Sequence, residues 1–174
     1  CACGGGEEER LQEMRTKLDP AGEIALTAVL TAQSEEKILE YTLSCGYTGG
    51  DTTVTILAPE SVAGITAQVS GEGLALSYGD AALELELLTE TGMAPVAVLP
   101  SMISALLEGH LQSTSTGSHG ETDCIVGEFF ADDGLTVSLW FQETDLVPVY
   151  GELWENGVRV AWCEISDWVC STAE

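Results

Sequence analysis

Few residues in this chain have the types and spacing of a catalytic site. His110 and His119 are its two histidines, and His119 follows Ser118 within Gly117-Ser118-His119-Gly120. A serine hydrolase places its nucleophile in a Gly-x-Ser-x-Gly turn, and the chain lacks that spacing. We therefore interpret the polar run 112–120 as a mobile loop. We predict no catalytic residues, and the protein is not expected to be an enzyme.

The acidic side chains also fail to form a recognisable metal or cofactor site. Asp132-Asp133-Gly134 resembles the start of a calcium loop, but the alternating oxygens and the later glutamate that such a loop needs do not follow. Pairs such as Glu143 and Asp145 have the chemistry of an acid and a base, but 29 acidic residues make chance pairs common. The sequence therefore predicts no metal and no cofactor, and a hairpin turn at Asp132-Asp133-Gly134.

The tryptophans and cysteines allow two interpretations each. The tryptophans would form either a platform for a sugar or another ligand or a cover for a sheet, and we favour the cover; they are Trp140, Trp154, Trp162 and Trp168. Four cysteines (Cys45, Cys124, Cys163 and Cys170) could form disulfides in an oxidising compartment, in any of three full pairings. They could equally be small buried thiols, and both alternatives stay open.

The first residues resemble the start of a processed lipoprotein. Cys1 is followed by Ala2-Cys3-Gly4-Gly5-Gly6, a small and flexible segment of the kind that tethers a domain to an acylated cysteine. The alternative is a chain cut at this point for other reasons. We expect Cys1 to carry a lipid, with residues 1–6 as the tether, so that the protein is anchored to the outside of a bacterial cell membrane.

The charge excludes some partners. Lys and Arg total 5 against 29 Asp and Glu, a formal net charge of −24. A surface this anionic repels phosphate backbones, so we predict no nucleic-acid binding. It also repels anionic lipid headgroups, so attachment to a membrane would have to come from the N-terminal lipid anchor.

The hydrophobic pattern predicts a sheet with two helices. Leu11, Met14 and Leu18 share one face of an expected helix over 7–18, which Asp19-Pro20 ends. From Gly22 onward apolar residues recur every second position, and Thr48 to Asp51 and Asn156-Gly157 have the composition of hairpin turns. Helical spacing returns in an expected short helix over 101–108, whose apolar residues are Met102, Ile103, Leu106 and Leu107.

These elements predict an α+β fold that is mainly antiparallel β, with about ten strands in one highly curved sheet. Because some face of such a sheet must be covered, the two helices are the expected cover. The C-terminal strands supply the following core candidates: Phe129, Leu135, Val137, Leu139, Phe141, Val158, Val160 and Trp162.

The C-terminal stretch resembles the LolA-like superfamily of bacterial lipoprotein carriers. The resemblance lies in the order of Trp140-Phe141, Leu146-Val147-Pro148, Asn156-Gly157 and Asp167-Trp168, and in a connector over 59–65. It is closer to the Gram-positive lipoprotein members, including the germination-associated lipoproteins. It implies a single domain over 7–171, a half-open β-barrel with an N-terminal helix, and a lid helix over an apolar concavity.

Two functions follow from that resemblance. In the first, the protein is an anchored extracytoplasmic lipoprotein that binds a lipid or acyl-chain ligand, with Met102, Ile103, Leu106 and Leu107 closing over the concave face. In the second, its own side chains fill the cavity, and it is a scaffold lipoprotein that engages a protein partner of the cell envelope. A shuttle between membranes fits poorly, because an acylated Cys1 would tether the domain.

Overall fold

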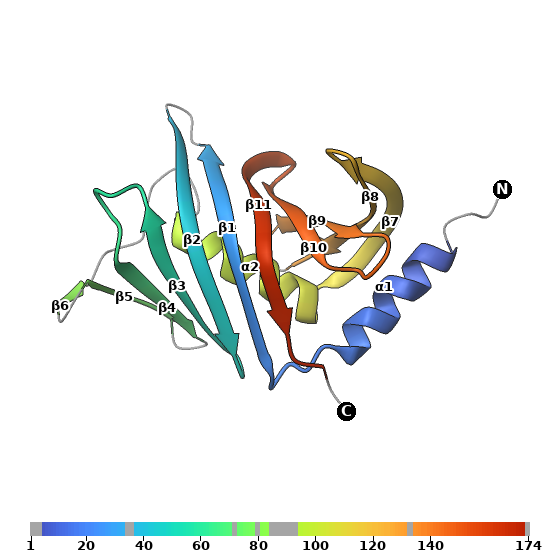
Figure 1. Cartoon of the computed structure of the whole chain (residues 1–174), viewed down its shortest axis with the longest axis horizontal. Helices are drawn as coiled ribbons and strands as arrows, with labels where there is room; N and C mark the ends of the chain where they lie inside the picture. Colours follow the sequence, from blue (N-terminus) through green and yellow to red (C-terminus); the bar gives the residue numbers. More distant parts are fainter. Residues whose placement is uncertain are drawn as a thin grey trace.

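A computed structural model describes residues 5–33, 37–70, 73–78, 81–83, 94–131 and 134–172. Within them, eleven strands form one antiparallel sheet that is curved and open (Figure 1). The predicted mainly antiparallel, half-open barrel is thus confirmed. The N-terminal residues up to Gly4 and the pair Asp132-Asp133, which belonged to a predicted hairpin turn, lie outside the described residues.

The elements follow one another in a simple order. The first half of the sheet contains β1 (Glu23–Gln33), β2 (Ile38–Thr48), β3 (Asp51–Ala58), β4 (Ile65–Ser70), β5 (Gly73–Tyr78) and β6 (Ala81–Leu83). The second half contains β7 (His110–His119), β8 (Thr122–Phe130), β9 (Leu135–Gln142), β10 (Pro148–Glu155) and β11 (Val158–Cys170). Helix α1 (Gly5–Lys17) precedes the sheet, and α2 (Pro95–Glu108) lies between the halves in the sequence.

The first and last strands join the two halves. The strand order is β6-β5-β4-β3-β2-β1-β11-β10-β9-β8-β7, so each half is a meander and β1 pairs with β11. Every neighbour within a half is also its neighbour in sequence, which short turns allow. The turn at Asn156-Gly157 has positive φ at both residues, 49° and 82°, as a tight hairpin requires. This turn and the one at Gly49-Gly50 occur where the sequence predicts them.

Helix α1 is held by one buried leucine and a glycine opposite it. Leu11 is fully buried, and a Cβ on Gly127 of β8 would lie 3.0 Å from its Cδ1 atom. The absence of a side chain at Gly127 therefore lets the helix approach the sheet closely. Leu18 is also buried and Met14 is partly buried, which confirms the predicted apolar face.

Helix α2 is longer than the sequence predicts. It begins at Pro95 rather than at Ser101, and it contains Pro100. Pro95 is tolerated in the first turn, where its missing N–H would have no partner. Pro100 costs an intrahelical hydrogen bond, but the extra turns bury Val96, Val98 and Leu99 against the sheet. Burial of this apolar face outweighs the local preference against proline. Among the described residues, neither helix has the length and hydrophobicity of a membrane span.

The loop predicted over 112–120 is wrong. Most of it is strand β7, which pairs with β8 from His110–Phe130 to His119–Thr122. A strand at the edge of a sheet is held by backbone hydrogen bonds to one neighbour, so its polar Ser and Thr side chains can face water.

Two residues that the sequence predicted for the core, Val158 and Trp162 of β11, lie outside it. Val158 is 63% exposed, and Ala161 and Cys163 are buried in its place. Trp162, between them, therefore lies on the outer face with Arg159 stacked on its ring. Apolar residues occupy both faces of this strand, so alternation alone does not identify the inner one.

Candidate functional site

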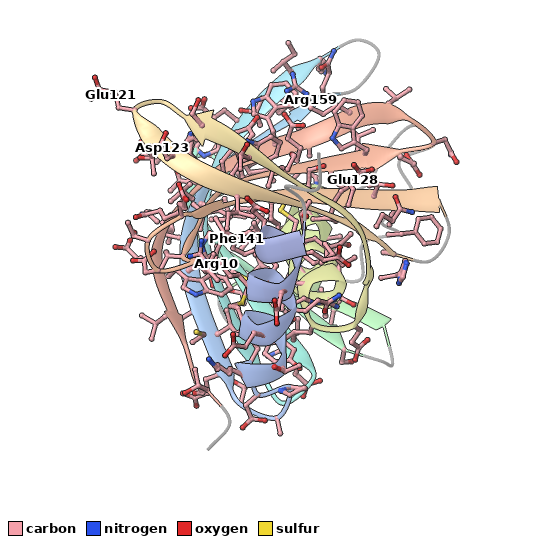
Figure 2. The ribbon with its side chains drawn as sticks, turned by 90° about the vertical axis from the view of Figure 1, so that its right-hand side faces the viewer. Arg10, Glu121, Asp123, Glu128, Phe141 and Arg159 are labelled. Carbon is pink, nitrogen blue, oxygen red and sulfur yellow. The ribbon has the colours of Figure 1, made fainter. Side chains whose placement is uncertain are left out.

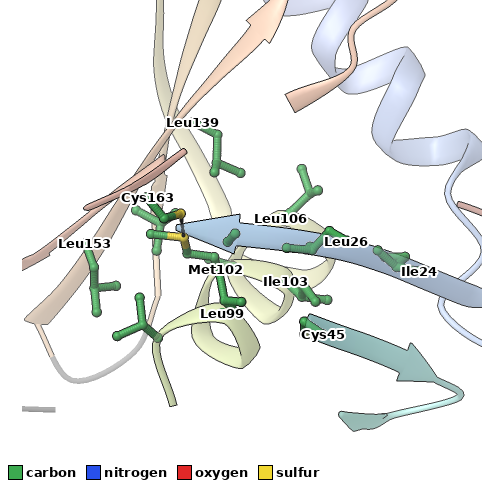
Figure 3. Close-up of a cluster of buried hydrophobic side chains, with 14 of the residues drawn as sticks. Ile24, Leu26, Cys45, Leu99, Met102, Ile103, Leu106, Leu139, Leu153 and Cys163 are labelled. Carbon is green, nitrogen blue, oxygen red and sulfur yellow. Dashed lines mark hydrogen bonds between the residues drawn. The ribbon is translucent and has the colours of Figure 1, made fainter. Parts of the chain in front are cut away.

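Helix α2 packs directly on the concave face of the sheet (Figure 3). Met102, Ile103 and Leu106 are 4%, 3% and 1% exposed, and Leu107 is partly buried. The Met102 sulfur lies 3.7 Å from Cys163 Sγ, and a Cβ on Gly151 would lie 3.1 Å from that same sulfur. The gap between this helix and the sheet, which we call the α2 gap, is only about 20 Å³. The structure therefore brings the predicted lid residues together, and their side chains leave little empty space between α2 and the sheet.

A larger space opens beside the helix. This α1 cleft has a volume of about 330 Å³, and its residues are Arg10, Glu13, Met14, Lys17, Leu18, Leu106, Phe141, Asp145, Leu146, Val147, Pro148, Trp168, Cys170 and Thr172. Helix α1 forms one wall, the β9–β10 turn forms the other, and Leu106 of α2 contributes to the floor. Figure 2 shows Arg10 and Phe141 at this place. The volume is at the lower end of the range for small-molecule sites, ~300–1,000 Å³.

A bulge in β11 turns Trp168 into the α1 cleft. Two residues of β1, Ala25 and Thr27, pair with Val169 and Ser166, so β11 has one extra residue there. Asp167 takes a positive φ of 53° within this bulge. Because an extra residue reverses the side-chain alternation, Trp168 faces inward although Trp162 faces outward. The bulge thus places the Trp168 side chain on the concave side of the sheet.

The opposite wall also contains an unusual backbone. Leu146 has a φ of 58°, a left-handed conformation that costs ~1–3 kcal/mol in a residue other than glycine. Its N–H donates to the carbonyl of Gln142, and the Val147 N–H donates to the Asp145 carboxylate. These bonds hold the turn so that Leu146 and Val147 line the cleft. Besides Leu146 and Asp167, the only non-glycine residue with positive φ in the described part of the chain is Asn156, in its hairpin turn.

Two arginines connect α1 to the rest of the domain. Arg15 donates from Nε to the carbonyl of Leu106 at 2.8 Å, and from Nη2 to the carbonyl of Gly109. These carbonyls end α2 and have no partner within the helix, so a cation is favourable there. Burial lowers the pKa of Arg15, whose guanidinium also lies 5.2 Å from the Phe129 ring centre. Arg10 donates to the carbonyl of Glu143 and fixes the other end of the wall.

A second cleft lies on the other flank of α2. Its volume is about 500 Å³, and residues that line it include Tyr47, Thr52, Ser104, Leu107 and Glu108. Its lining carries more hydroxyl groups than that of the α1 cleft. Ile103 borders both this space and the α2 gap, and Leu106 borders both the α2 gap and the α1 cleft. The predicted lid residues thus separate three spaces.

The outer tryptophans belong to a self-contained network. The Glu152 carboxylate accepts hydrogen bonds from Tyr150 (3.1 Å), Trp154 (3.1 Å) and Arg159 (2.8 Å). Burial, and then the charge of Glu152, raises the pKa of Tyr150 to about 12. His119 stacks on the Tyr150 ring with centroids 4.5 Å apart. His119 and Arg159 lie against the Tyr150 and Trp162 rings, which favours the interpretation that the outer tryptophans cover the sheet.

The candidate metal ligands among the described residues do not assemble into a site. No group of three His, Cys, Asp or Glu side chains is placed to hold a metal ion within the part of the chain that the structure describes. His119 instead contacts the Glu164 carboxylate at 2.6 Å, which fastens the end of β7 onto β11. Cys45, Cys124, Cys163 and Cys170 are free thiols, and the first three are buried. Burial raises the pKa of Cys45 and of Cys163 to about 12, which makes their thiolates rare.

The sequence predicted the apolar helix that contains Met102 and Leu106 but missed most of the α1 cleft. Arg10, Lys17 and Trp168 were not predicted to lie together, because a helix, a turn and a bulge from distant parts of the chain position them. The Leu146-Val147-Pro148 segment was singled out only as part of a family resemblance. No local pattern identifies a cleft that forms between such elements.

Comparisons with known proteins support the fold. No family model matches the chain, and no curated protein matches it either. A solved structure of a LolA superfamily protein from Nitrosomonas europaea is 14% identical and matches over 97% of this chain and 94% of that one, with a TM-score of 0.50. An uncharacterized conserved protein from Thermus thermophilus is 10% identical over 96% and 89%, with the same TM-score. The chain therefore has the LolA-like fold.

Proposed function

We propose that this protein is a non-enzymatic, membrane-anchored extracytoplasmic lipoprotein that binds a hydrophobic, acyl-like ligand on the concave side of its half-barrel. The observation that carries the proposal is the α1 cleft, an apolar space of about 330 Å³ beside the lid helix. Burying an alkyl chain there would be favourable by ~25 cal/mol per Å² of apolar surface. The lid residues would act as the floor of the site, with Leu106 in direct contact with the ligand.

Two backbone features favour binding over simple packing. The bulge at Asp167 and the left-handed Leu146 both direct apolar side chains into the cleft. Strained residues of this kind are found preferentially where a ligand is held. The LolA-like fold agrees with a carrier or binding role, and Cys1 would supply the membrane anchor.

A second function is favoured by the contact beneath α2. The α2 gap is about 20 Å³, and Met102 and Leu106 are almost fully buried. A self-filled core of this kind fits a scaffold lipoprotein that engages a protein partner of the cell envelope. In that case the α1 cleft would stay empty.

Native mass spectrometry of the protein after mild extraction from its own membrane separates the two. The carrier should emerge with an added lipid mass that collisional activation removes, and the same spectrum reports acylation of Cys1. Trp168→Ala should lose the added mass, because Trp168 lines the α1 cleft. Trp162→Ala on the outer face is the matched control and should keep it. A bare protein in every preparation would reject ligand binding and leave the scaffold function.

A further inference from the structure

We propose that the ligand of the α1 cleft is a single-chain amphiphile with an anionic head group, whose alkyl chain lies in the cleft and whose head lies at the rim between Arg10 and Lys17. A carboxylate and a phosphate monoester share the required chemistry. The inference rests on the proposed function, and it adds a charge selectivity that a merely hydrophobic site would lack.

The rim concentrates the scarce cations of this protein. The chain has 5 Lys and Arg against 29 Asp and Glu, yet Arg10 and Lys17 both line the α1 cleft. They are seven residues apart on α1, which places them two turns apart on the same face of the helix. Two of the other cations serve elsewhere: Arg15 holds the end of α2, and Arg159 is bound to Glu152.

Both cations keep donors for an incoming anion. Arg10 donates one hydrogen bond to the carbonyl of Glu143, and a guanidinium carries five N–H donors. Lys17 donates to Glu13 at 2.9 Å, and an ammonium carries three donors. Arg10 is held at the mouth by its bond to the β9–β10 turn, so an anion would find it already placed. The hydrogen bonds between Arg10 and the anion would join two charged groups, which makes them stronger than bonds between neutral groups.

The carboxylates at the rim are already engaged. Glu13 accepts the bond from Lys17, which lowers the pKa of Glu13. Asp145 accepts the N–H of Val147 within the β9–β10 turn. Glu13 would nevertheless compete with a bound anion for Lys17, and this competition gives the proposal a test with opposite signs. Removing Lys17 should weaken an anionic ligand, and removing the charge of Glu13 should strengthen it.

The experiment compares dodecanoate with 1-dodecanol, which share the alkyl chain and differ in the charge of the head. Binding to the lipid-free full-length protein is measured by isothermal titration calorimetry at low and at high salt. At low salt dodecanoate should bind more tightly than 1-dodecanol. Because the net charge of −24 repels every anion, the attraction at the rim is measured as the loss of dodecanoate binding that Lys17→Gln causes, and this loss should shrink as salt rises. Dodecyl phosphate in place of dodecanoate shows which head the rim prefers.

Three variants test the rim. Lys17→Gln should weaken dodecanoate about 1.4- to fivefold, the range for solvent-exposed ion pairs, and leave 1-dodecanol unchanged. Glu13→Gln should strengthen dodecanoate by a similar factor. Lys37→Gln changes the net charge by the same amount as Lys17→Gln but does not line the cleft, so it should have no comparable effect.

The outcomes separate this inference from the proposed function. Equal binding of both probes at low salt, or equal effects of Lys17→Gln and Lys37→Gln, would overturn the anionic head group and leave a hydrophobic carrier. Failure of every probe to bind would reject the α1 cleft as a site altogether.

Discussion

Leu106 is the residue at which stability and binding should respond in opposite directions. It is 1% exposed and lies between the α1 cleft and the α2 gap. Leu106→Ala removes three buried carbons, which costs about 2.4 kcal/mol at ~0.8 kcal/mol each. The cavity that remains adds about 1 kcal/mol. This places the total toward the low side of the losses measured for Leu→Ala in protein cores, because the cavity opens into an existing cleft. We expect a total loss of about 3–4 kcal/mol of unfolding free energy.

The same truncation should improve ligand binding, because it joins the α1 cleft to the α2 gap and makes room for a longer alkyl chain. Thermal unfolding followed by circular dichroism measures both effects. The midpoint should fall by about 6–16 °C without ligand, from ~2–4 °C per kcal/mol for a domain of this size. Saturating dodecanoate should then raise it further in the variant than in the original protein, since stabilisation grows with affinity.

Leu99→Ala is the matched control. Leu99 is equally buried on the same helix and borders the α2 gap but does not line the α1 cleft. It should lose a similar amount of stability and gain nothing in its response to dodecanoate. A loss of less than about 1 kcal/mol in Leu106→Ala would refute the direct packing of α2 on the sheet. An identical ligand response in both variants would refute the connection between the two spaces.

Two further predictions concern the sheet itself. Glu152→Ala should cost about 2–4 kcal/mol in urea unfolding, because three donors lose a charged acceptor; Glu40→Ala on the surface should stay within about 0.5 kcal/mol, and similar losses in both variants would contradict the network. The buried thiol of Cys163 has a pKa raised to about 12, whereas the thiol of an unfolded chain ionises near 9.0. Its contribution to stability is therefore complete below pH 9 and declines as pH rises toward 12, so Cys163→Ala should lose stability less steeply than the original protein over the accessible part of this range. Parallel declines in the two proteins would show that this thiol is not desolvated.

Periodicity predicted the elements well where each strand has one wet and one dry face. Leu26, Ala28 and Leu30 of β1 are buried in alternation as expected. It failed for β7, whose polar residues form a strand because β8 supplies the backbone partners. It also failed at the start of α2, where burial against the sheet overrides the preference of Pro100. In both cases a tertiary contact decides the local structure.

The sequence by itself determined the fold class, the turns at Gly49-Gly50 and Asn156-Gly157, and the apolar character of α2. It did so because period-two alternation and turn residues are local signals. Only the tertiary structure decided that Met102 and Leu106 fill the space beneath that helix, and that the open space lies beside it. The α1 cleft depends on one extra residue in the pairing of β11 with β1, which turns Trp168 inward. The pairing of two strands determines such a shift, so the sequence of either strand alone does not predict it.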